Sequence, residues 1–348
     1  MPRDAIPAPP PVRLPGTVVL ARRLQLSAKE IAAVTALTEA ARAADGAAPL
    51  SEHVELHVRH GGDPGTQHLL LWERPGDGDL VGYAHLDVTD WVEGPAAELV
   101  IHPAHRRQGL GGALVATLVQ STGGRLRLWA HGALPGSEAL ADRFGFRTAR
   151  VLRVLGRSLT TGPLPEPVWP EGVTVRTFRP GSDEAAWVAL NARAFVALPD
   201  QGGWTEDDLL LRESEPWFDP AGFFLAERAA ADGGPPRLVG FHWTKVHGDR
   251  PNGHAHPHPA GAPLDHAHGG GSHQHRLLGE VYVVGVDPDE RGSGLGLALT
   301  LTGLHHLRRE GLAQVMLYVD ESNPAALRLY DRLGFTLWSR DVLHRLGP

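Results

Sequence analysis

The sequence predicts an α/β fold that occurs twice along the chain, and two observations support this prediction. Gly-rich turns follow an apolar, β-rich run in both halves, ELVIHPAHRRQGLGG at 98–112 and EVYVVGVDPDERGSGLG at 280–296, and each turn opens an apolar helical stretch. The offset between the halves is nearly constant, at 185 residues from Arg106 to Arg291 and 189 from Gly145 to Gly334. Self-similarity at a fixed period indicates a repeated fold.

The length of 348 residues fits two domains of about 150 residues each. We expect a disordered, Pro-rich N-terminal tail at 1–16, a first domain at 17–160 and a second at 173–348. The segment TGPLPEPVWPEG at 161–172 is typical of a semi-extended linker.

Within each half we expect strands to alternate with helices around a mixed sheet. In the second half the predicted strands are GVTVRTF (172–178), AGFFLAER (221–228), LVGFHWTKV (238–246), EVYVVGV (280–286), QVMLYVD (314–320) and TLWSRDVLHRL (336–346). The predicted helices are EAAWVALNARAF (184–195), LGLALTLTGLHHLRRE (295–310) and PAALRLYDRLGF (324–335).

Composition excludes several classes of function. A net charge of −7 argues against a general nucleic-acid or membrane surface, and no run of 18 apolar residues exists. The N-terminus lacks the apolar region of a secretory signal, so we expect a cytoplasmic protein. The absence of cysteine excludes disulfides, thiolate metal sites and a cysteine nucleophile.

The turn at 291–296, RGSGLG, predicts an anion site. Glycines allow a positive φ and a close approach of the backbone, so that successive N–H groups converge on a ligand. The positive end of the following helix adds to this attraction, and a diphosphate is the natural ligand. A tight turn without function is the alternative, but the recurrence in both halves counts against it.

These motifs resemble the GNAT acetyltransferases. The family's strand, R-G-x-G-x-G turn and N-x-x-A-x-x-L-Y-x-x-x-G-F helix stand here as VYVVGVDPDERGSGLG and NPAALRLYDRLGF. The resemblance covers nearly the whole chain. It implies two tandem GNAT domains, each with a mixed, mostly antiparallel sheet flanked by helices, and acetyl-CoA as co-substrate without a metal.

The resemblance implies a cofactor pose in which a bulged central strand pairs with the pantetheine arm, and Gly285 is a credible place for that bulge. In the second half the implied cofactor-binding residues are Val284, Gly285, Val286, Arg291, Gly292, Ser293, Gly294, Leu295, Gly296, Leu297, Asn323, Pro324, Ala325, Ala326, Leu327 and Arg328. In the first half they are Leu99, Val100, Ile101, Arg107, Gln108, Gly109, Leu110, Gly111 and Gly112.

Two side chains are candidates for proton transfer. Glu280 begins the central strand on the same face as Tyr282, so we expect it to act as general base, and the resemblance assigns the base to this position as well. A solubilising charge at the edge of a strand is the alternative. Tyr330, four residues before Gly334, is the candidate acid for the departing thiolate, although a helix tyrosine alone more often packs in a core.

Further residues are expected to contact a polar acceptor. Lys245 ends a strand in a chain with only one other lysine, Lys29, and a solvated charge is the alternative. The resemblance implies contacts from Tyr318, from Glu52 in the first half, and from Asp200. Asp200 stands where the family has glutamate, so its shorter side chain weakens this expectation.

The first half lacks the catalytic pair. Glu280 lies eight residues before the proline that precedes its Gly-rich turn, and the same count in the first half gives Pro95. Tyr330 lies four residues before the glycine of its Gly-Phe pair, and the same count in the first half gives Ala141. Glu98 is nearby but three residues away from the Pro95 position. We therefore expect the first half to keep a cofactor loop without turning over.

Residues 247–276 contain eight histidines among Gly, Pro and Ala. His-x-His spacing can bind Zn or Ni, but a flexible hairpin connection is the favoured interpretation, and we predict no metal.

The predicted activity is direct N-acetylation by a monomer. The motifs GFHWTKVH, LGEVYVVGVDP and LYVDESNPAALRLY resemble tandem GNAT members whose acceptor is the cysteinyl amine of Cys-GlcN-Ins. Another amine (an aminoglycoside, a polyamine or a protein N-terminus) remains an alternative, as does a non-catalytic acetyl-CoA sensor. Glu280 and Tyr330 count against the sensor.

Overall fold

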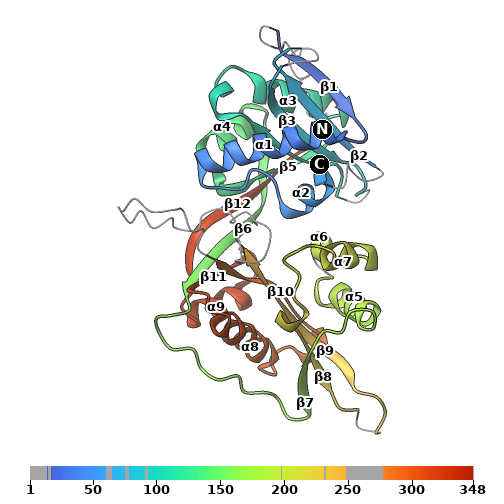
Figure 1. Cartoon of the computed structure of the whole chain (residues 1–348), viewed down its shortest axis with the longest axis vertical. Coiled ribbons are helices and arrows are strands. Elements are labelled where there is room, and N and C mark those ends of the chain that lie inside the picture. Colours follow the sequence, from blue (N-terminus) through green and yellow to red (C-terminus); the bar gives the residue numbers. More distant parts are fainter. Residues whose placement is uncertain are drawn as a thin grey trace, which may run out of the picture.

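Among the described residues, twelve strands form one sheet in the order β1-β2-β3-β4-β5-β12-β6-β11-β10-β9-β8-β7 (Figure 1). The structure, a computed structural model, describes residues 14, 17–59, 65–74, 78–90, 93–196, 198–230, 233–247 and 277–347, without the side chains of Pro199 and Asp200. The predicted tail at 1–16, Leu14 excepted, and the histidine-rich segment after His247 lie outside the described residues.

The first half contains six strands and four α-helices among its described residues. The strands are β1 (Val19–Arg23), β2 (Thr66–Trp72), β3 (Leu80–Asp87), β4 (Ala96–Ile101), β5 (Leu126–Ala130) and β6 (Arg147–Ser158). The helices are α1 (Ala28–Asp45), α2 (Glu52–Arg59), α3 (Leu110–Ser121) and α4 (Pro135–Arg143), with 3₁₀ turns η1 (Pro103–His105) and η2 (His131–Ala133).

The second half repeats this order. Its strands are β7 (Val173–Thr177), β8 (Phe223–Arg228), β9 (Arg237–His247), β10 (Leu278–Val286), β11 (Gln314–Asp320) and β12 (Thr336–Leu346). Its helices are α5 (Glu184–Ala194), α6 (Pro199–Gly202), α7 (Glu206–Glu213), α8 (Leu295–Arg309) and α9 (Pro324–Arg332), with 3₁₀ turns η3 (Pro220–Gly222) and η4 (Pro288–Glu290). Each segment predicted for this half forms the expected element, and the predicted tandem α/β fold is confirmed.

Helices cover both faces of the sheet in each half, because the strands are apolar on both sides (Figure 1). In the first half, Leu114 of α3 packs on one face and Val34 of α1 on the other. In the second half, Leu304 of α8 packs on one face and Trp187 of α5 on the other. No helix in the described ranges is both long and apolar enough to cross a bilayer.

The final strands of the two halves are exchanged, which the sequence analysis did not anticipate. β12 pairs with β5 of the first half, from Val342 opposite Ala130 to Leu346 opposite Leu126. β6 pairs with β11 of the second half, from Gln314 opposite Ser158 to Asp320 opposite Leu152. β6 and β12 also pair with each other, so one hydrogen-bonded sheet joins the halves.

The central strand β10 has its bulge at Tyr282, not at Gly285 as expected. Val281 lies opposite Thr244 and Val283 opposite Trp243, so one extra residue is inserted between them. Val281 accordingly packs in the cluster under α8, whereas Val283 packs on the α5 face. Gly285 is in register, and an added Cβ there would collide with the ring of Phe241.

The two parallel pairings in the sheet splay apart after a few residues. β10 pairs with β11 from Gly279 to Val281, and β4 pairs with β5 at Ala96 and Ala97. Beyond these points, the described register gives β10 and β4 a partner on one side alone. The backbone groups at 284–286 and 99–101 therefore face a gap that a strand-like ligand can pair with.

Candidate active site

Glu280 lies in β10 with its side chain buried, 5% exposed. Its neighbours across the sheet are Lys245 of β9 and Met316 of β11. The carboxylate Oε2 lies 2.6 Å from Nε2 of His247, which is also buried. The imidazole orients the carboxylate, which is compatible with the predicted role of Glu280 as general base.

Lys245 joins Glu280 on this face, as its register in β9 dictates. Its Nζ donates a hydrogen bond to Oε1 of Glu52, which begins α2 in the first half. The ammonium also lies 4.1 Å from the ring centroid of Trp217 and 5.2 Å from that of Tyr282. The lysine is thus a buried, paired cation and not a solvated one, because its side chain is 6% exposed.

Glu52 is ionised in this setting. Burial alone would raise its pKa, but the charge of Lys245 and the hydrogen bond from it, with Arg212 and His247 nearby, lower the pKa of the carboxyl below its ordinary value. The site therefore alternates acidic and basic groups drawn from both halves.

Aromatic and basic side chains of the 204–217 region form a wall that sequence reasoning missed. Arg212 of α7 donates from Nε to the Tyr282 hydroxyl at 2.9 Å, and its guanidinium lies 3.7 Å from the ring centroid of Trp204. Trp217 contacts Tyr282 edge to face, at 5.2 Å between centroids. The density of tryptophan between 187 and 243 was the available signal.

Tyr318 of β11 is 39% exposed at the seam between the halves. Desolvation of the phenolate, together with the carboxylates of Asp341, Glu280 and Glu52, raises the pKa of this tyrosine well above its ordinary value. It is therefore a neutral phenol at physiological pH, suited to exchanging hydrogen bonds with a hydroxyl group.

Tyr330 of α9 is 8% exposed and packs edge to face on Phe335, at 5.6 Å between centroids. Burial raises the pKa of its phenol to about 12, so it keeps its proton at physiological pH. The helix that carries it starts at an Asn-Pro pair, where Oδ1 of Asn323 accepts the N–H of Ala326 at 3.1 Å.

The Gly-rich turn before α8 has the predicted backbone. Gly292 has φ 82° and Gly294 has φ 89°, and no atom lies within 4 Å of a Cβ built at either position. Ser293 Oγ accepts the N–H of Leu295 at 3.3 Å. The other N–H groups of the first helical turn lack intrahelical partners and stand at the positive end of the helix.

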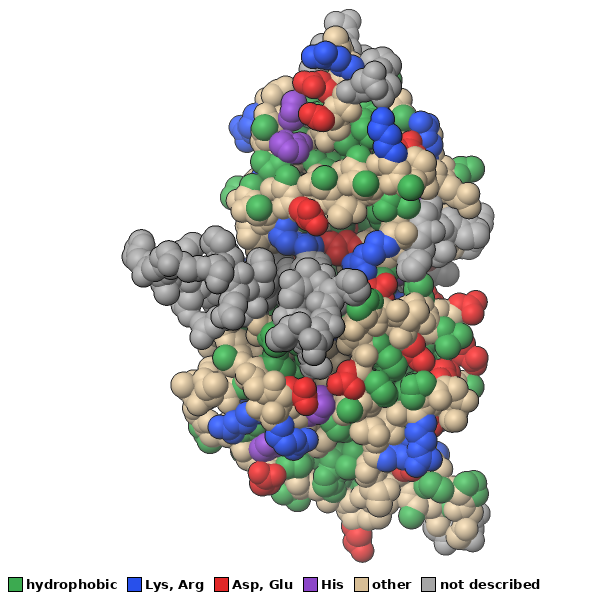
Figure 2. Space-filling model, in the orientation of Figure 1, with side chains coloured by type: hydrophobic (Ala, Val, Ile, Leu, Met, Phe, Trp, Pro, Cys, Tyr) green, Lys and Arg blue, Asp and Glu red, His purple; other side chains and the backbone are tan. Residues whose placement is uncertain are grey.

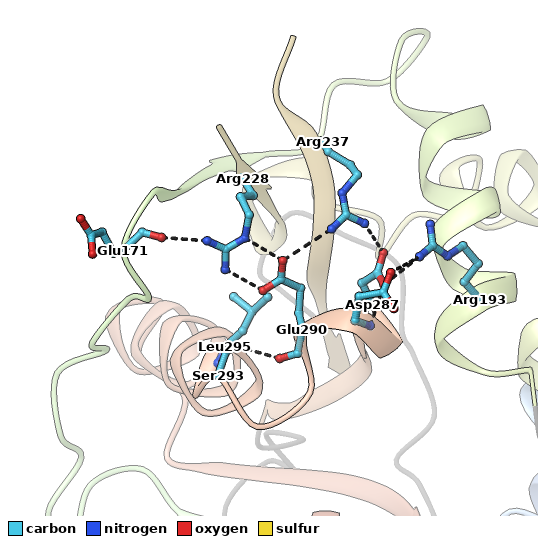
Figure 3. Close-up of polar contacts among 9 residues, drawn as sticks. Glu171, Arg193, Arg228, Arg237, Asp287, Glu290, Ser293 and Leu295 are labelled. Carbon is cyan, nitrogen blue, oxygen red and sulfur yellow. Dashed lines mark hydrogen bonds and ion pairs between the residues drawn. The ribbon is translucent and has the colours of Figure 1, made fainter. Parts of the chain in front are cut away.

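Three arginines are paired with the acidic residues that lead into this turn, as Figure 3 shows. Asp287, fully buried, is bound by Arg193 at 2.8 Å and by Arg237 at 2.7 Å. Glu290 takes two hydrogen bonds from Arg228, both at 2.6 Å. Because both acids belong to the stretch that enters the Gly-rich turn, these ion pairs fix its position relative to β8 and β9.

A known protein family matches each half of the chain separately. The model of the Acetyltransferase (GNAT) family matches residues 34–146 and, separately, 189–335. The chain belongs to the GNAT acetyltransferase family. GNAT enzymes use acetyl-CoA as co-substrate, and the glycine turn and splayed strand described above fit that role.

The relatives and solved structures agree with this. The "Mycothiol acetyltransferase" of Streptosporangium roseum is 53% identical over 354 residues, covering 93% of this chain and 98% of that protein. The protein of that name from Thermobispora bispora is 54% identical, covering 90% and 95%. A GCN5-related N-acetyltransferase from Sphaerobacter thermophilus has a TM-score of 0.62 at 27% identity, covering 96% of both chains. A tandem GNAT protein from the clavulanic acid pathway has a TM-score of 0.64 at 20% identity and covers 95% and 99%, a likeness of fold alone.

The structure brings most of the predicted acceptor residues of this GNAT protein together. Glu52 and Lys245 are in contact, Lys245 lies beside Glu280, and the charges of Glu280 and Glu52 act on Tyr318. The side chain of Asp200 lies outside the described residues, although the backbone of its helix α6 is present. Their roles in binding stay predictions.

The predicted cofactor residues of α9 have two environments. Asn323 caps the helix with its side chain. Leu327 and Arg328 line an open pocket of about 480 Å³ with residues of β6 and β12, such as Arg153 and Thr336. Among the described residues, no group of histidine or acidic side chains is arranged to hold a metal ion.

In the first GNAT half, the counterpart of Glu280 is Ala96 and not Pro95. Ala96 pairs with Arg127 of β5 in the same way that Glu280 pairs with Met316 of β11. Arg127 and Met316 are equivalent positions, because they are 189 residues apart, the same offset as between Gly145 and Gly334. The expected count was wrong by one because β10 contains the bulge at Tyr282. Alanine cannot accept a proton either, so the inference about this half is unchanged.

Proposed function

We propose that the protein is a mycothiol synthase that transfers the acetyl group of acetyl-CoA to the cysteinyl amine of Cys-GlcN-Ins. The observation that carries the proposal is the mixed site of Glu280, Lys245 and Glu52, to which both halves of the chain contribute. The names of relatives more than 50% identical over nearly the full chain support this choice of acceptor.

The first step is deprotonation of the acceptor ammonium. Glu280, held by His247, takes this proton, and the free amine attacks the thioester carbonyl. Free N–H groups along the splayed edge of β10 would stabilise the oxyanion that develops. Lys245 and Glu52 would exchange hydrogen bonds with the sugar or inositol hydroxyls.

The second step is collapse of the tetrahedral intermediate with loss of the CoA thiolate. Tyr330 is neutral and buried, so it can donate its proton to the departing sulfur as the C–S bond breaks. The nitrogen gives up its extra proton in the same step, and that proton restores the phenol, directly or through water. We expect the transfer to be direct, since the chain contains no cysteine and no obvious activated serine to carry an acetyl group. The proposal includes a monomeric enzyme acting in the cytoplasm, and light scattering of the purified protein tests its mass.

The test is an acceptor panel with acetyl-CoA, followed by mass spectrometry of the products, since Cys-GlcN-Ins itself carries a thiol that would obscure colorimetric detection of CoA. The panel holds Cys-GlcN-Ins, its analogue without cysteine, an aminoglycoside, spermidine and a peptide N-terminus. Hydroxylamine treatment separates an N-acetyl from an S-acetyl product. We expect N-acetylation of Cys-GlcN-Ins with kcat/KM far above that of the others. A polyamine or an aminoglycoside as the preferred acceptor would overturn the proposal.

A further inference from the structure

Glu98 lies on β4 of the first half, and its side chain is 6% exposed. Its carboxylate accepts both donors of Ser51, the backbone N–H at 2.6 Å and the hydroxyl at 2.7 Å. Ser51 directly precedes α2, and its Oγ accepts the N–H of Val54 at 3.4 Å. A carboxylate that holds the residue before a helix fixes where that helix begins.

His131 of η2 connects Glu98 to the exchanged strand. Its Nε2 lies 3.3 Å from Glu98, and its Nδ1 lies 2.9 Å from Asp341 of β12. Asp341 also accepts the N–H of Gly132 at 2.8 Å. Burial disfavours a charged imidazole, but the two carboxylates outweigh it and raise the pKa of His131 to about 10. The ring is therefore a cation between two anions.

This chain of contacts leads to the acceptor site of the other half. The residue after Ser51 is Glu52, whose carboxylate is bonded to Lys245 in β9. At the far end of α2, Arg59 is paired with Glu215 of the second half at 2.6 Å. The position of α2 between the halves thus depends on contacts at both of its ends, and Glu98 supplies the one beside Glu52.

We propose that Glu98 is a positioning residue for acceptor recognition: it holds the start of α2, and thereby Glu52, against Lys245. The inference rests on the proposed function in that Glu52 and Lys245 bind the acceptor. Glu98 accepts no proton from substrate. The first half, which has Ala96 where the base would stand, contributes to the reaction by presenting this helix.

The test is E98Q, with E30Q as the matched control. Glu30 accepts the same two donors from Ser27, at 2.9 and 2.8 Å, at the start of α1. The glutamine removes the charge that faces His131 and Ser51. We expect the KM for the acceptor to rise about tenfold in E98Q, as for a lost charge-assisted hydrogen bond, with kcat and the KM for acetyl-CoA nearly unchanged. E30Q should leave all three unchanged.

A double-mutant cycle with E52Q separates positioning from general destabilisation. If Glu98 acts through Glu52, E98Q adds little to the acceptor KM in the E52Q background. A purely structural role would lower the melting temperature and the active fraction without raising the acceptor KM. An unchanged acceptor KM in E98Q would overturn the inference. So would a rise in acceptor KM that is as large in the E52Q background as in the parent chain.

Hydrogen exchange gives a readout that does not depend on the acceptor. Amides at 52–59 should exchange faster in E98Q than in the parent chain or in E30Q. Faster exchange in a protein that fails to acetylate Cys-GlcN-Ins would overturn the proposed function but support the hold of Glu98 on α2. Unchanged exchange in an active E98Q enzyme would overturn the inference alone.

Discussion

The two halves share the backbone conformation of a Gly-rich turn and differ in the side chains at the positions proposed to transfer protons. Gly109 has φ 89° and ψ −6°, and Gly294 has φ 89° and ψ −5°. The second half has Glu280 and Tyr330 where the first has alanines. A cradle of N–H groups does not depend on side chains, so it persists after substitutions that abolish acid–base chemistry.

The surroundings of the two turns differ as well. Arg106 of the first half is bound by both oxygens of Asp45, at 2.6 and 2.7 Å, whereas its counterpart Arg291 is exposed. Arg107, with φ 64°, takes the left-handed position that Gly292 fills in the second half. A non-glycine residue is disfavoured at this φ, so the first half forms its turn at a conformational cost that Gly292 avoids in the second half.

Charged side chains are mixed in sign on the face of the molecule drawn in Figure 2. In the coloured part of the face shown in Figure 2, acidic and basic side chains are interspersed among apolar ones, with no single basic region. Such a mixture of charges on this face is compatible with the proposed small-molecule acceptor, whereas an extended polyanion is bound by a continuous basic surface.

The largest expected effect is that of E280Q. Removal of the base should lower kcat by roughly 10²-fold or more, because the glutamine keeps the shape but accepts no proton. E98Q is the paired variant in the first half and should leave kcat nearly unchanged. Steady-state kinetics with both substrates varied decide the point. If kcat fell only slightly in E280Q but strongly in E98Q, the first half would be the active one and the assignment would be wrong.

Y330F should have the next largest effect, a loss of about 10- to 100-fold in kcat, because the phenol is the proposed proton donor. The ring keeps its packing on Phe335, so the melting temperature should barely change. Y83F is the control in the first half, since the hydroxyl of Tyr83 lies 2.7 Å from His68 and away from the chemistry. Its kcat should equal that of the parent chain. Full activity in Y330F would assign the acid elsewhere.

G294A and G109A compare the two turns directly. Both positions have φ 89° and open space around an added Cβ, so each variant should lose about 1 kcal/mol of stability through backbone strain. We expect only G294A to raise the KM for acetyl-CoA, by about three- to tenfold. An equal rise in G109A would show that cofactor bound in the first half takes part in turnover.

H247Q tests how the base is oriented. The imidazole lies 2.6 Å from Glu280, and a glutamine amide would restore the contact imperfectly. We expect kcat to fall about threefold, because the carboxylate is held less firmly, with the KM for acetyl-CoA unchanged. H305Q, at a histidine bonded to the carbonyl of Pro165, is the control. A kcat of H247Q equal to that of the parent chain would contradict this role.

The smallest expected effect is a dependence of stability on pH that belongs to the first half. His131 and Ser51 hold the pKa of Glu98 down to about 2 against the effect of burial. A depressed carboxyl pKa stabilises the fold above about pH 4.5, and this contribution is lost as pH falls toward 2. The raised pKa of His131 adds stability that is lost as pH rises through about 10. H131Q should flatten both limbs of the melting-temperature profile by a few degrees, and unchanged limbs would refute the assignment.

Much of the fold and of the catalytic strand was predictable because the signals are local. The Gly-rich turns, the alternation that places Glu280 with Tyr282, and the Asn-Pro start of α9 are each determined by neighbouring residues. The bulge was misplaced at Gly285, because an inserted residue is recognised only from the partner strand, where Thr244 and Trp243 reveal it.

The sequence by itself determined the duplication, the two Gly-rich turns and the absence from the first half of the residues proposed to transfer protons, since each follows from spacing and residue type. Only the tertiary structure decided the exchange of β6 and β12, the linkage of Glu98 through His131 to Asp341, and the aromatic wall beside Lys245. The physical reason is distance along the chain. His131 and Asp341 are 210 residues apart, and Lys245 and Glu52 are 193 apart, so neither ion pair leaves a mark on local periodicity.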